Sequence, residues 1–246
     1  MQDALMAVVL AAGKGTRLQS EQSQLPKVLR RANGQPLLHW VLEALSFIPR
    51  QDIVVVAGFM KEAVMEAFPN CRFAVQEPQL GTGHAVLCAQ DALRDFDGTV
   101  LVCYGDMPLL RRETYLALLE EHRNSGAACT LLSGRSDKPL AYGRVLRDDE
   151  GNFLAVVEDR DCTPEQKQIP ELNCGIYAFD CRKLLGALTR LRPDNAQGEY
   201  YLTDVPALLR ADGERVRVCS RQLNEELLGV NTPEQLAEAE AFLRQR

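Results

Sequence analysis

Short apolar runs alternate with longer amphipathic segments over the first 105 residues of the chain. Runs rich in Val and Leu and bounded by Gly, Pro or Asn are typical of buried strands. The segments between them carry apolar residues at helical spacing. Strands that alternate with helices in this way indicate a parallel sheet covered on both faces. The predicted strands are Met6–Leu10, Ile53–Val56, Phe73–Val75 and Thr99–Cys103, and the predicted helices are Leu37–Leu45, Phe59–Phe68 and Ala85–Leu93.

The pattern is looser after Asp106, where strands outnumber helices. With no repeat of 20–50 residues and no low-complexity linker, the 246 residues predict one domain, 1–246. We expect an α/β fold, Rossmann-like, with a mostly parallel mixed sheet and helices on both faces. The remaining predicted elements are the strands Cys129–Leu132, Tyr142–Arg147, Phe153–Val157, Leu172–Phe179 and Val216–Cys219 and the helices Glu113–Asn124, Arg182–Leu191 and Pro233–Leu243.

Composition and charge narrow the class of protein. The residues are 46% hydrophobic and 25% charged, and no apolar run approaches the roughly 20 residues of a membrane span. The first apolar stretch, Ala4–Ala12, lacks a basic leader and continues into a glycine loop, so it does not predict a signal peptide. We therefore expect a cytoplasmic protein that does not act at a membrane. The sequence leaves the oligomeric state open.

Cysteine and histidine spacing gives no sign of a disulfide framework or a zinc site. The chain has eight cysteines and three histidines, but no CxxC or CxH pair. We expect reduced thiols, buried at the five positions with apolar neighbours, which are Cys88, Cys103, Cys129, Cys174 and Cys219.

Positive charge is concentrated near the N-terminus. Residues 1–31 hold five basic and two acidic side chains, a net charge of +3. The net charge of the whole chain is −6, so the remaining residues carry a net charge of −9. A nucleic-acid-binding protein needs a broad basic face, which this distribution does not offer. A basic loop on an acidic body suits a small polyanion such as a nucleotide phosphate.

The loop LAAGKGTRL, from Leu10 to Leu18, follows the first predicted strand. Small residues here let the backbone approach a ligand at the carboxyl edge of the sheet, and Lys14 and Arg17 add positive charge. The loop is not a Walker A motif, because Gly15 stands where Ser or Thr should follow Lys14, and it lacks the third glycine of a dinucleotide fingerprint. A tight turn without a ligand remains the alternative.

Three further segments bear polar groups at the same predicted edge. Lys27 follows a proline, which presents its ammonium from a stiff backbone. Asp106 stands between glycine and proline after the fourth predicted strand, a common position for a magnesium ligand. The segment QLGTGH, residues 79–84, offers backbone donors and a hydroxyl. Taken singly, these segments are also compatible with a surface lysine, a turn-forming aspartate and a loop that begins a helix.

Together the segments resemble the uridyltransferase domain of bacterial N-acetylglucosamine-1-phosphate uridyltransferase, a sugar-nucleotide nucleotidyltransferase. The resemblance covers Ala7 to about Leu236, and QLGTGHA and NAQGEYYLTD are its most specific parts. It implies an enzyme that forms UDP-N-acetylglucosamine, a cell wall precursor, and pyrophosphate from UTP and N-acetylglucosamine 1-phosphate, with magnesium. The matching segments are LAAGKGTRL, LPKVL, QLGTGHA, YGDMPLL, YGRV, VVED, ELNCGIY, NAQGEYYLTD and GVNTPEQL.

The resemblance also implies roles for individual residues. Arg17 and Lys27 would serve the phosphates, and Asp106, with Arg17 and Lys27, would form the catalytic set. Asp106 and Asn231 would hold magnesium. Uridine would be framed by Leu10, Ala11, Ala12, Gly13, Gln76, Gly81 and Thr82, with Gly105 beside the metal ligand, and the sugar by Gly143, Glu158, Asn173, Tyr201 and Thr203. Residues of about 1–110 would bind the nucleotide and those of about 111–231 the sugar.

The chain departs from the family pattern at several positions. About three extra residues separate Arg17 from Lys27, Cys174 replaces a threonine after Asn173, and Arg160 replaces a lysine. Bifunctional members continue into a left-handed β-helix acetyltransferase, and since these residues end at Arg246 we expect no acetyltransfer from them; whether the domain stands alone stays open. Alternatives are a uridylyltransferase or other nucleotidyltransferase for another sugar 1-phosphate, such as glucose 1-phosphate, and a non-catalytic nucleotide-sugar sensing module.

Overall fold

Strand β1 (Leu5–Ala11) lies at the centre of the parallel half of the sheet. The computed structural model describes residues 4–18, 25–136 and 140–246. Strand β1 pairs in parallel with β4 (Ile53–Ala57) and β6 (Thr99–Tyr104), and β4 pairs in parallel with β5 (Arg72–Val75). The predicted βαβ arrangement is therefore confirmed. It brings the carboxyl ends of β1 and β6 to one edge, where open α/β folds bind ligands.

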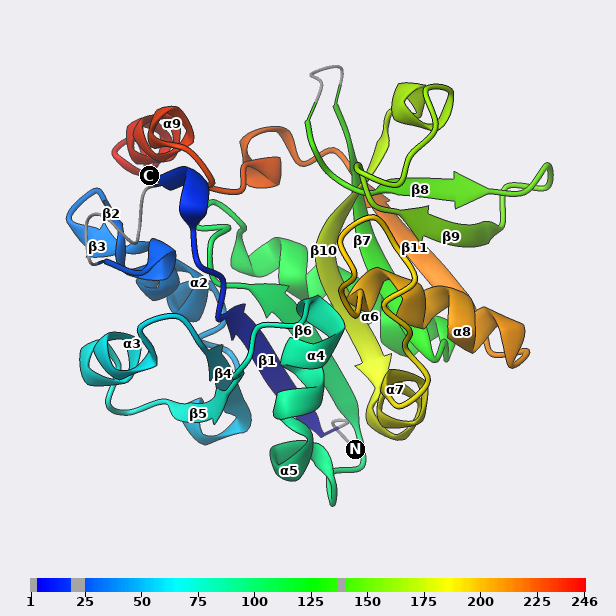
Figure 1. Ribbon diagram of the computed structural model, residues 1–246, viewed down its shortest axis with the longest axis horizontal. Helices are drawn as coiled ribbons and strands as arrows, with labels where there is room; N and C mark the ends of the chain where they lie inside the picture. The colour runs from blue at the N-terminus through cyan, green and yellow to red at the C-terminus, as the bar shows by residue number, and fades with distance from the viewer. Residues whose placement is uncertain (1–3, 19–24, 137–139) are drawn as a thin grey trace.

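The other half of the sheet is mixed. Strand β10 (Glu171–Asp180) runs antiparallel to β6 and to β7 (Cys129–Arg135), while β11 (Val216–Arg221) is parallel to β7. Within the described ranges the sheet has nine strands, in the order β11-β7-β10-β6-β1-β4-β5, with β8 and β9 attached through β10 (Figure 1). The mostly parallel mixed sheet predicted from the sequence is confirmed. The additional strands are β8 (Arg144–Arg147), β9 (Phe153–Val157) and the small hairpin of β2 (Arg31–Ala32) and β3 (Gln35–Pro36).

Helices cover both faces of the sheet, as predicted. Side chains of β1 alternate between the two: Val8 and Leu10 belong to one apolar cluster and Ala7 and Val9 to the other. A third cluster packs the last helix, α9 (Pro233–Leu243), against Leu37. The first face is covered by α4 (Thr82–Cys88), α5 (Gln90–Leu93), α7 (Cys181–Leu188) and α8 (Val205–Ala211), and the second by α2 (Leu37–Ala44), α3 (Lys61–Ala67) and α6 (Arg112–Ser125) (Figure 1).

Some predicted bounds are wrong for local backbone reasons. The helix predicted over residues 85–93 is two helices, because Ala89 leaves helical geometry (φ −88°, ψ 3°) between α4 and α5. Helix α3 begins at Lys61 rather than Phe59, because Met60 is left-handed (φ 50°). Helix α7 ends at Leu188, three residues before the predicted end. Helix α8 is an additional element, outside those predicted, and its first turn contains a proline, which is a favoured position.

The cysteine prediction is right in outline and wrong at two positions. All eight thiols are free, and Cys103, Cys129, Cys174 and Cys219 are buried as expected. Cys88 is only half-buried, at the last residue of α4, while Cys181 is buried at the start of α7. None of the helices in residues 4–18, 25–136 and 140–246 is both long enough and apolar enough to cross a membrane.

A buried carboxylate ties four strands of the mixed half together. Glu171 of β10 accepts hydrogen bonds from Ser133 of β7 (2.7 Å) and Ser220 of β11 (2.6 Å), and an ion pair from Arg147 of β8 (2.7 Å). Burial raises the pKa of Glu171, but the hydrogen bonds from Arg147, Ser220 and Ser133 outweigh it and lower that pKa to about 2. The ionised form is therefore the one that stabilises the fold.

We predict that Glu171→Gln lowers the free energy of unfolding at pH 7 by on the order of 3 kcal/mol, as expected when one partner of a buried ion pair is lost. The depressed pKa means that the wild-type advantage is fully present above about 4.5, the ordinary value, and shrinks as pH falls toward 2. Urea unfolding of both proteins between pH 7 and pH 3 measures this. Glu240→Gln, at an exposed pair with Arg244, is the control, and an equal difference at both pH values would contradict the prediction.

Candidate active site

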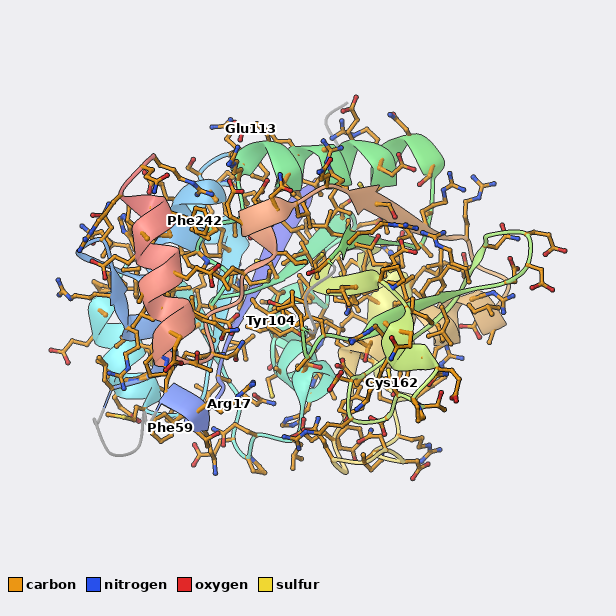
Figure 2. The ribbon with its side chains drawn as sticks, turned by 90° about the horizontal axis from the view of Figure 1, so that it is seen from above. Arg17, Phe59, Tyr104, Glu113, Cys162 and Phe242 are labelled. Carbon is orange, nitrogen blue, oxygen red and sulfur yellow. The ribbon has the colours of Figure 1, made fainter. Side chains whose placement is uncertain are left out.

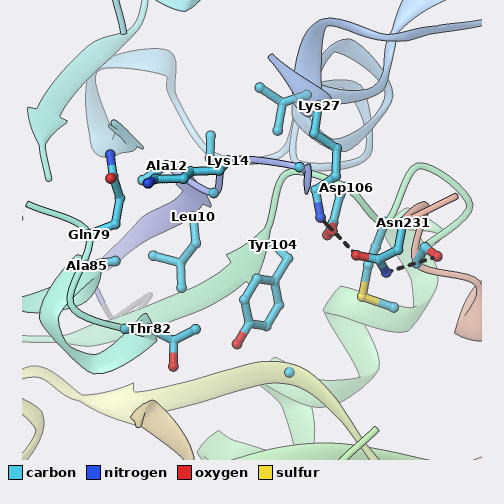
Figure 3. A pocket seen from close by; sticks show the side chains of 18 of the residues that line it. Leu10, Ala12, Lys14, Lys27, Gln79, Thr82, Ala85, Tyr104, Asp106 and Asn231 are labelled. Atoms are coloured by element: carbon cyan, nitrogen blue, oxygen red, sulfur yellow. Dashed lines mark hydrogen bonds and ion pairs between the residues drawn. The ribbon is translucent and has the colours of Figure 1, made fainter. Parts of the chain in front are cut away.

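A cavity of about 680 Å³ opens at the carboxyl ends of β1 and β6. This volume is in the range of small-molecule sites. Its lining combines the loop after β1, the segment at Lys27, the start of α4, the end of β6, and parts of the mixed half of the sheet (Figure 3). Of the predicted site residues, those that line it are Leu10, Ala11, Ala12, Gly13, Arg17, Lys27, Gln76, Gly81, Thr82, Asp106, Gly143, Asn173 and Asn231.

The loop before α4 is fixed against a segment 120 residues later in the chain. Tyr200 donates a backbone hydrogen bond to Leu80 O and accepts one from Gly83 N, both at 2.8 Å. The Thr82 hydroxyl accepts from Leu202 N at 3.0 Å. A Cβ at Gly81 would lie 2.7 Å from the Tyr200 carbonyl oxygen, and the φ of +109° there also requires glycine. The glycines of this motif thus allow a close backbone approach that shapes the cavity wall.

Gln76 follows β5, in this wall, and is only 3% exposed. Its Nε2 atom lies 2.8 Å from Gly81 O and 3.2 Å from His84 Nδ1. The side chain is therefore held in place before any ligand binds.

Lys27, Asp106 and Asn231 converge at the other side of the cavity (Figure 3). Lys27 forms an ion pair with Asp106, and its Nζ lies 3.1 Å from Asn231 Oδ1. The side chains of Lys27 and Asp106 are 16% and 14% exposed. A backbone hydrogen bond from Val230 N to Asp106 O (2.9 Å) brings the Asn231 segment to the end of β6.

The oxygens of Asp106 and Asn231 fit a divalent cation. They already share one positive charge, the Lys27 ammonium, and a carboxylate with an amide oxygen is a donor set that hard cations accept. Within the described ranges, no group of three or more His, Cys, Asp or Glu side chains could hold a metal ion.

Two more cations reach the cavity from the loop after β1. Lys14 and Arg17 both line it, and Figure 2 shows Arg17 at the short 3₁₀ turn Thr16–Leu18. The extra residues that separate Arg17 from Lys27 fall largely at 19–24, outside the described residues. Positive charge at this end of the cavity matches the distribution expected around a triphosphate.

The predicted sugar-side residues divide into two layers. Gly143 and Asn173 line the cavity, and Asn173 is fixed by donating to Tyr177 Oη (2.7 Å) and accepting from Gly175 N (3.3 Å). Other predicted residues lie outside the lining; these are Gly105, Glu158, Tyr201 and Thr203.

The layer outside the lining is internally hydrogen-bonded. Thr203 donates to Glu158 Oε1 (3.0 Å), and burial raises the pKa of Glu158. Tyr201 donates to Asp161 Oδ2 (3.2 Å) and accepts from Gln197 Nε2 (2.9 Å). These contacts give the layer a defined shape without a ligand.

Several lining residues were not singled out from the sequence. The clearest are Tyr104, Gln79, Tyr142 and Glu199. All four belong to segments that carry the family resemblance or adjoin them, so their place in those segments was the available signal. Tyr104 precedes Gly105 and Asp106 at the end of β6, which brings it to the cavity.

Comparison with known proteins agrees with this architecture. A model of the MobA-like NTP transferase domain matches residues 7–168. The chain is 46% identical over 246 residues to the bifunctional protein GlmU of Syntrophotalea carbinolica, covering 99% of this chain and 52% of that protein. It is 48% identical over 241 residues to the GlmU protein of Heliobacterium modesticaldum, covering 98% and 52%. The chain thus spans about half the length of the curated relatives it matches.

One solved structure supports the fold. A Bacillus anthracis protein assigned as a glucose-1-phosphate thymidylyltransferase superposes with a TM-score of 0.75 at 20% sequence identity, covering 99% of this chain and 96% of that one. The likeness confirms the predicted fold class. The resemblance to the uridyltransferase domain of GlmU-type proteins, found from the motifs, is confirmed by the relatives.

Proposed function

The chain belongs to the MobA-like NTP transferase domain family, and on that premise we propose that it transfers a uridylyl group from UTP to N-acetylglucosamine 1-phosphate. The products are UDP-N-acetylglucosamine and pyrophosphate. The observation that carries the proposal is the cavity at the carboxyl edge of the sheet, which Lys14, Arg17 and Lys27 line together with Asp106 and Asn231.

The reaction needs positioning and charge neutralisation more than covalent chemistry from the protein. A phosphate oxygen of the sugar phosphate forms a bond to the α-phosphorus of UTP, and the bond from that phosphorus to the leaving pyrophosphate breaks. Lys14, Arg17 and Lys27 would bind the phosphates and stabilise the negative charge that moves onto pyrophosphate. No protein nucleophile is required.

Enzymes of the GlmU type use a divalent metal, and we propose Mg²⁺ held by Asp106 and Asn231. Bound there, the metal would supply positive charge that neutralises the phosphates. In the structure the Lys27 ammonium contacts the carboxylate of Asp106 and the amide oxygen of Asn231, so it must move away from these two oxygens as the metal and the phosphates bind. Its ammonium is then free to contact a phosphate, which is the role that the family resemblance implies.

We propose that residues of about 1–110 bind the nucleotide and those of about 111–231 bind the sugar. Asn173 and Gly143, in the cavity wall, would contact the sugar directly. Glu158, with Tyr201 and Thr203 behind that wall, would shape the sugar pocket and reach the ligand after small movements. Cys174, where the family has threonine, also lines the cavity, so glucose 1-phosphate is the strongest rival substrate.

We predict that UTP is preferred over CTP by tenfold to more than a hundredfold in specificity constant. A site built to hydrogen-bond one base leaves polar groups unpaired with another, at about 1–3 kcal/mol for each. Pyrophosphate release should be measured with UTP, CTP, GTP and dTTP against N-acetylglucosamine 1-phosphate and glucose 1-phosphate.

The same panel separates the alternatives. A specificity constant for glucose 1-phosphate at or above that of the N-acetylated sugar removes the N-acetyl assignment but keeps uridylyl transfer. Binding of nucleotide sugar without turnover of any pair would instead favour a sensing module. The intact set of Lys27, Asp106 and Asn231 favours an enzyme.

A further inference from the structure

The NH₂ group of the Gln76 side chain is held by two acceptors of the protein. Its Nε2 carries two hydrogens and lies 2.8 Å from Gly81 O and 3.2 Å from His84 Nδ1. Among the described residues none donates a hydrogen bond to Oε1, the other atom of the amide. Because Gln76 lines the cavity, this oxygen is the group left to meet a ligand.

The orientation of this amide follows from the chemistry of its neighbours. Gly81 O can only accept, so the NH₂ group and not the oxygen must face it. The second hydrogen then points at His84 Nδ1, which accepts only when it carries no proton. Burial lowers the pKa of His84, which favours the neutral imidazole.

The other nitrogen of His84 is suited to carry the proton. Its Nε2 lies 3.7 Å from Cys88 Sγ, a weak acceptor one turn further along α4. The same sulfur lies 4.0 Å from Nδ1, so Cys88 does not by itself decide the tautomer. The contact from the Gln76 NH₂ group to Nδ1 does, because it requires an unprotonated Nδ1.

We propose that His84 is a positioning residue that sets base choice, by holding the NH₂ group of Gln76 so that Oε1 faces the base as an acceptor. The inference rests on the proposed function, because it requires a pyrimidine in this part of the cavity. Uracil offers a donor at N3, whereas cytosine has an acceptor there and an amino group at C4. A fixed amide oxygen therefore suits uracil and repels the N3 lone pair of cytosine.

His84→Leu tests this, since leucine removes the acceptor and leaves Gly81 O alone to restrain the amide. We expect the ratio of specificity constants for UTP and CTP to fall about tenfold, the effect of one hydrogen bond to an oriented group. His84→Asn can place an amide oxygen near the position of Nδ1, so this variant should keep most of the wild-type ratio. His39→Leu makes the same substitution at a half-buried histidine of α2, outside the cavity lining, and should change neither constant.

A purely structural role for His84 predicts a different result. In that case His84→Leu lowers the constants for UTP and CTP by the same factor, and the inference is overturned while the wild-type preference for UTP, and with it the proposed function, stands. A wild-type enzyme that uses CTP as well as UTP also overturns the inference, because no base choice is then left for His84 to set, whereas only a failure to turn over UTP overturns the proposed function. Titration calorimetry with UTP and CTP in the absence of sugar phosphate should show the same loss of discrimination in binding.

The tautomer of His84 can be read from its ¹⁵N shifts in the wild-type protein, even if His84→Leu fails to fold. We expect a neutral His84 with its proton on Nε2 at pH 7. A proton on Nδ1 would leave Gly81 O as the one remaining acceptor of these two, with none for the second hydrogen of the Gln76 NH₂ group, and would overturn the inference.

Discussion

Replacing Asp106 with alanine should abolish measurable turnover while the fold stays intact. The carboxylate follows the last residues of β6 and faces the cavity, where its partners are Lys27 and the segment of Asn231. Without it, a divalent cation would keep only the amide oxygen of Asn231 among the proposed protein ligands, and the phosphates would lose their shared counter-charge. Because the side chain does not pack in the apolar clusters, its loss should cost little stability.

The measurement is pyrophosphate release at saturating magnesium, with thermal unfolding as the check on folding. Asp91→Ala, on α5 at a fully exposed ion pair with Arg94, is the matched control and should keep wild-type activity. Near-normal rates for Asp106→Ala would remove Asp106 from the metal site. If Asp106→Ala alone failed to fold, this would contradict the expectation that the Asp106 carboxylate contributes little to stability.

Lys27→Ala and Arg17→Ala should each lower kcat by 10²–10³-fold. Both cations line the cavity, and a group that stabilises charge only as pyrophosphate leaves contributes about 3–4 kcal/mol, by analogy with the loss of an oxyanion-hole donor. Lys27→Ala should also release Asp106 and Asn231, so we expect tighter binding of Mg²⁺ in the absence of nucleotide. Arg17, from the loop after β1, should show the kinetic loss without that gain.

Arg244→Ala is the control for these two variants, because Arg244 is the C-cap residue of α9 and forms an ion pair with Glu240 away from the cavity lining. Steady-state kinetics with UTP and the sugar phosphate should show no change in this protein. Equal losses in all three variants would mean that destabilisation, and not phosphate binding, had been measured. Unfolding curves of the variants decide that point.

The parallel half of the fold was predictable because each of its elements carries a local signal. Strand β1 is a continuous apolar run that ends in small residues, and nothing in its tertiary surroundings opposes that preference. The position of Asp106 at the end of β6 follows from the same pattern. The chemistry of the loop after β1, with its two cations, was therefore predictable as well.

The convergence of Asp106 with Asn231 was not predictable from periodicity. The two residues are 125 positions apart, and the backbone hydrogen bond from Val230 to Asp106 that joins their segments leaves no trace in the spacing of residues. Only the family resemblance suggested it. Local signals cannot reveal long-range pairings of this kind, since they depend on how loops cross at the sheet edge.

Which polar atoms donate hydrogen bonds and which accept them could not be predicted from the sequence either. Thr82 is expected to frame uridine, and only the structure shows that its hydroxyl also accepts a hydrogen bond from Leu202 N. Gln76 is expected to frame the uridine, and only the structure shows that two protein acceptors hold the nitrogen of its amide. Such assignments require the neighbours in space, because a side chain's donors and acceptors are shared with whatever packs against it.

The central claim, that this cavity transfers a uridylyl group, is tested most directly by following both phosphorus-containing products. ³¹P NMR of the protein with UTP, N-acetylglucosamine 1-phosphate and magnesium should show pyrophosphate and UDP-N-acetylglucosamine growing in equal amounts, with no signal from orthophosphate. Release of orthophosphate without a nucleotide sugar, or no change in the UTP resonances at high protein concentration, would contradict it.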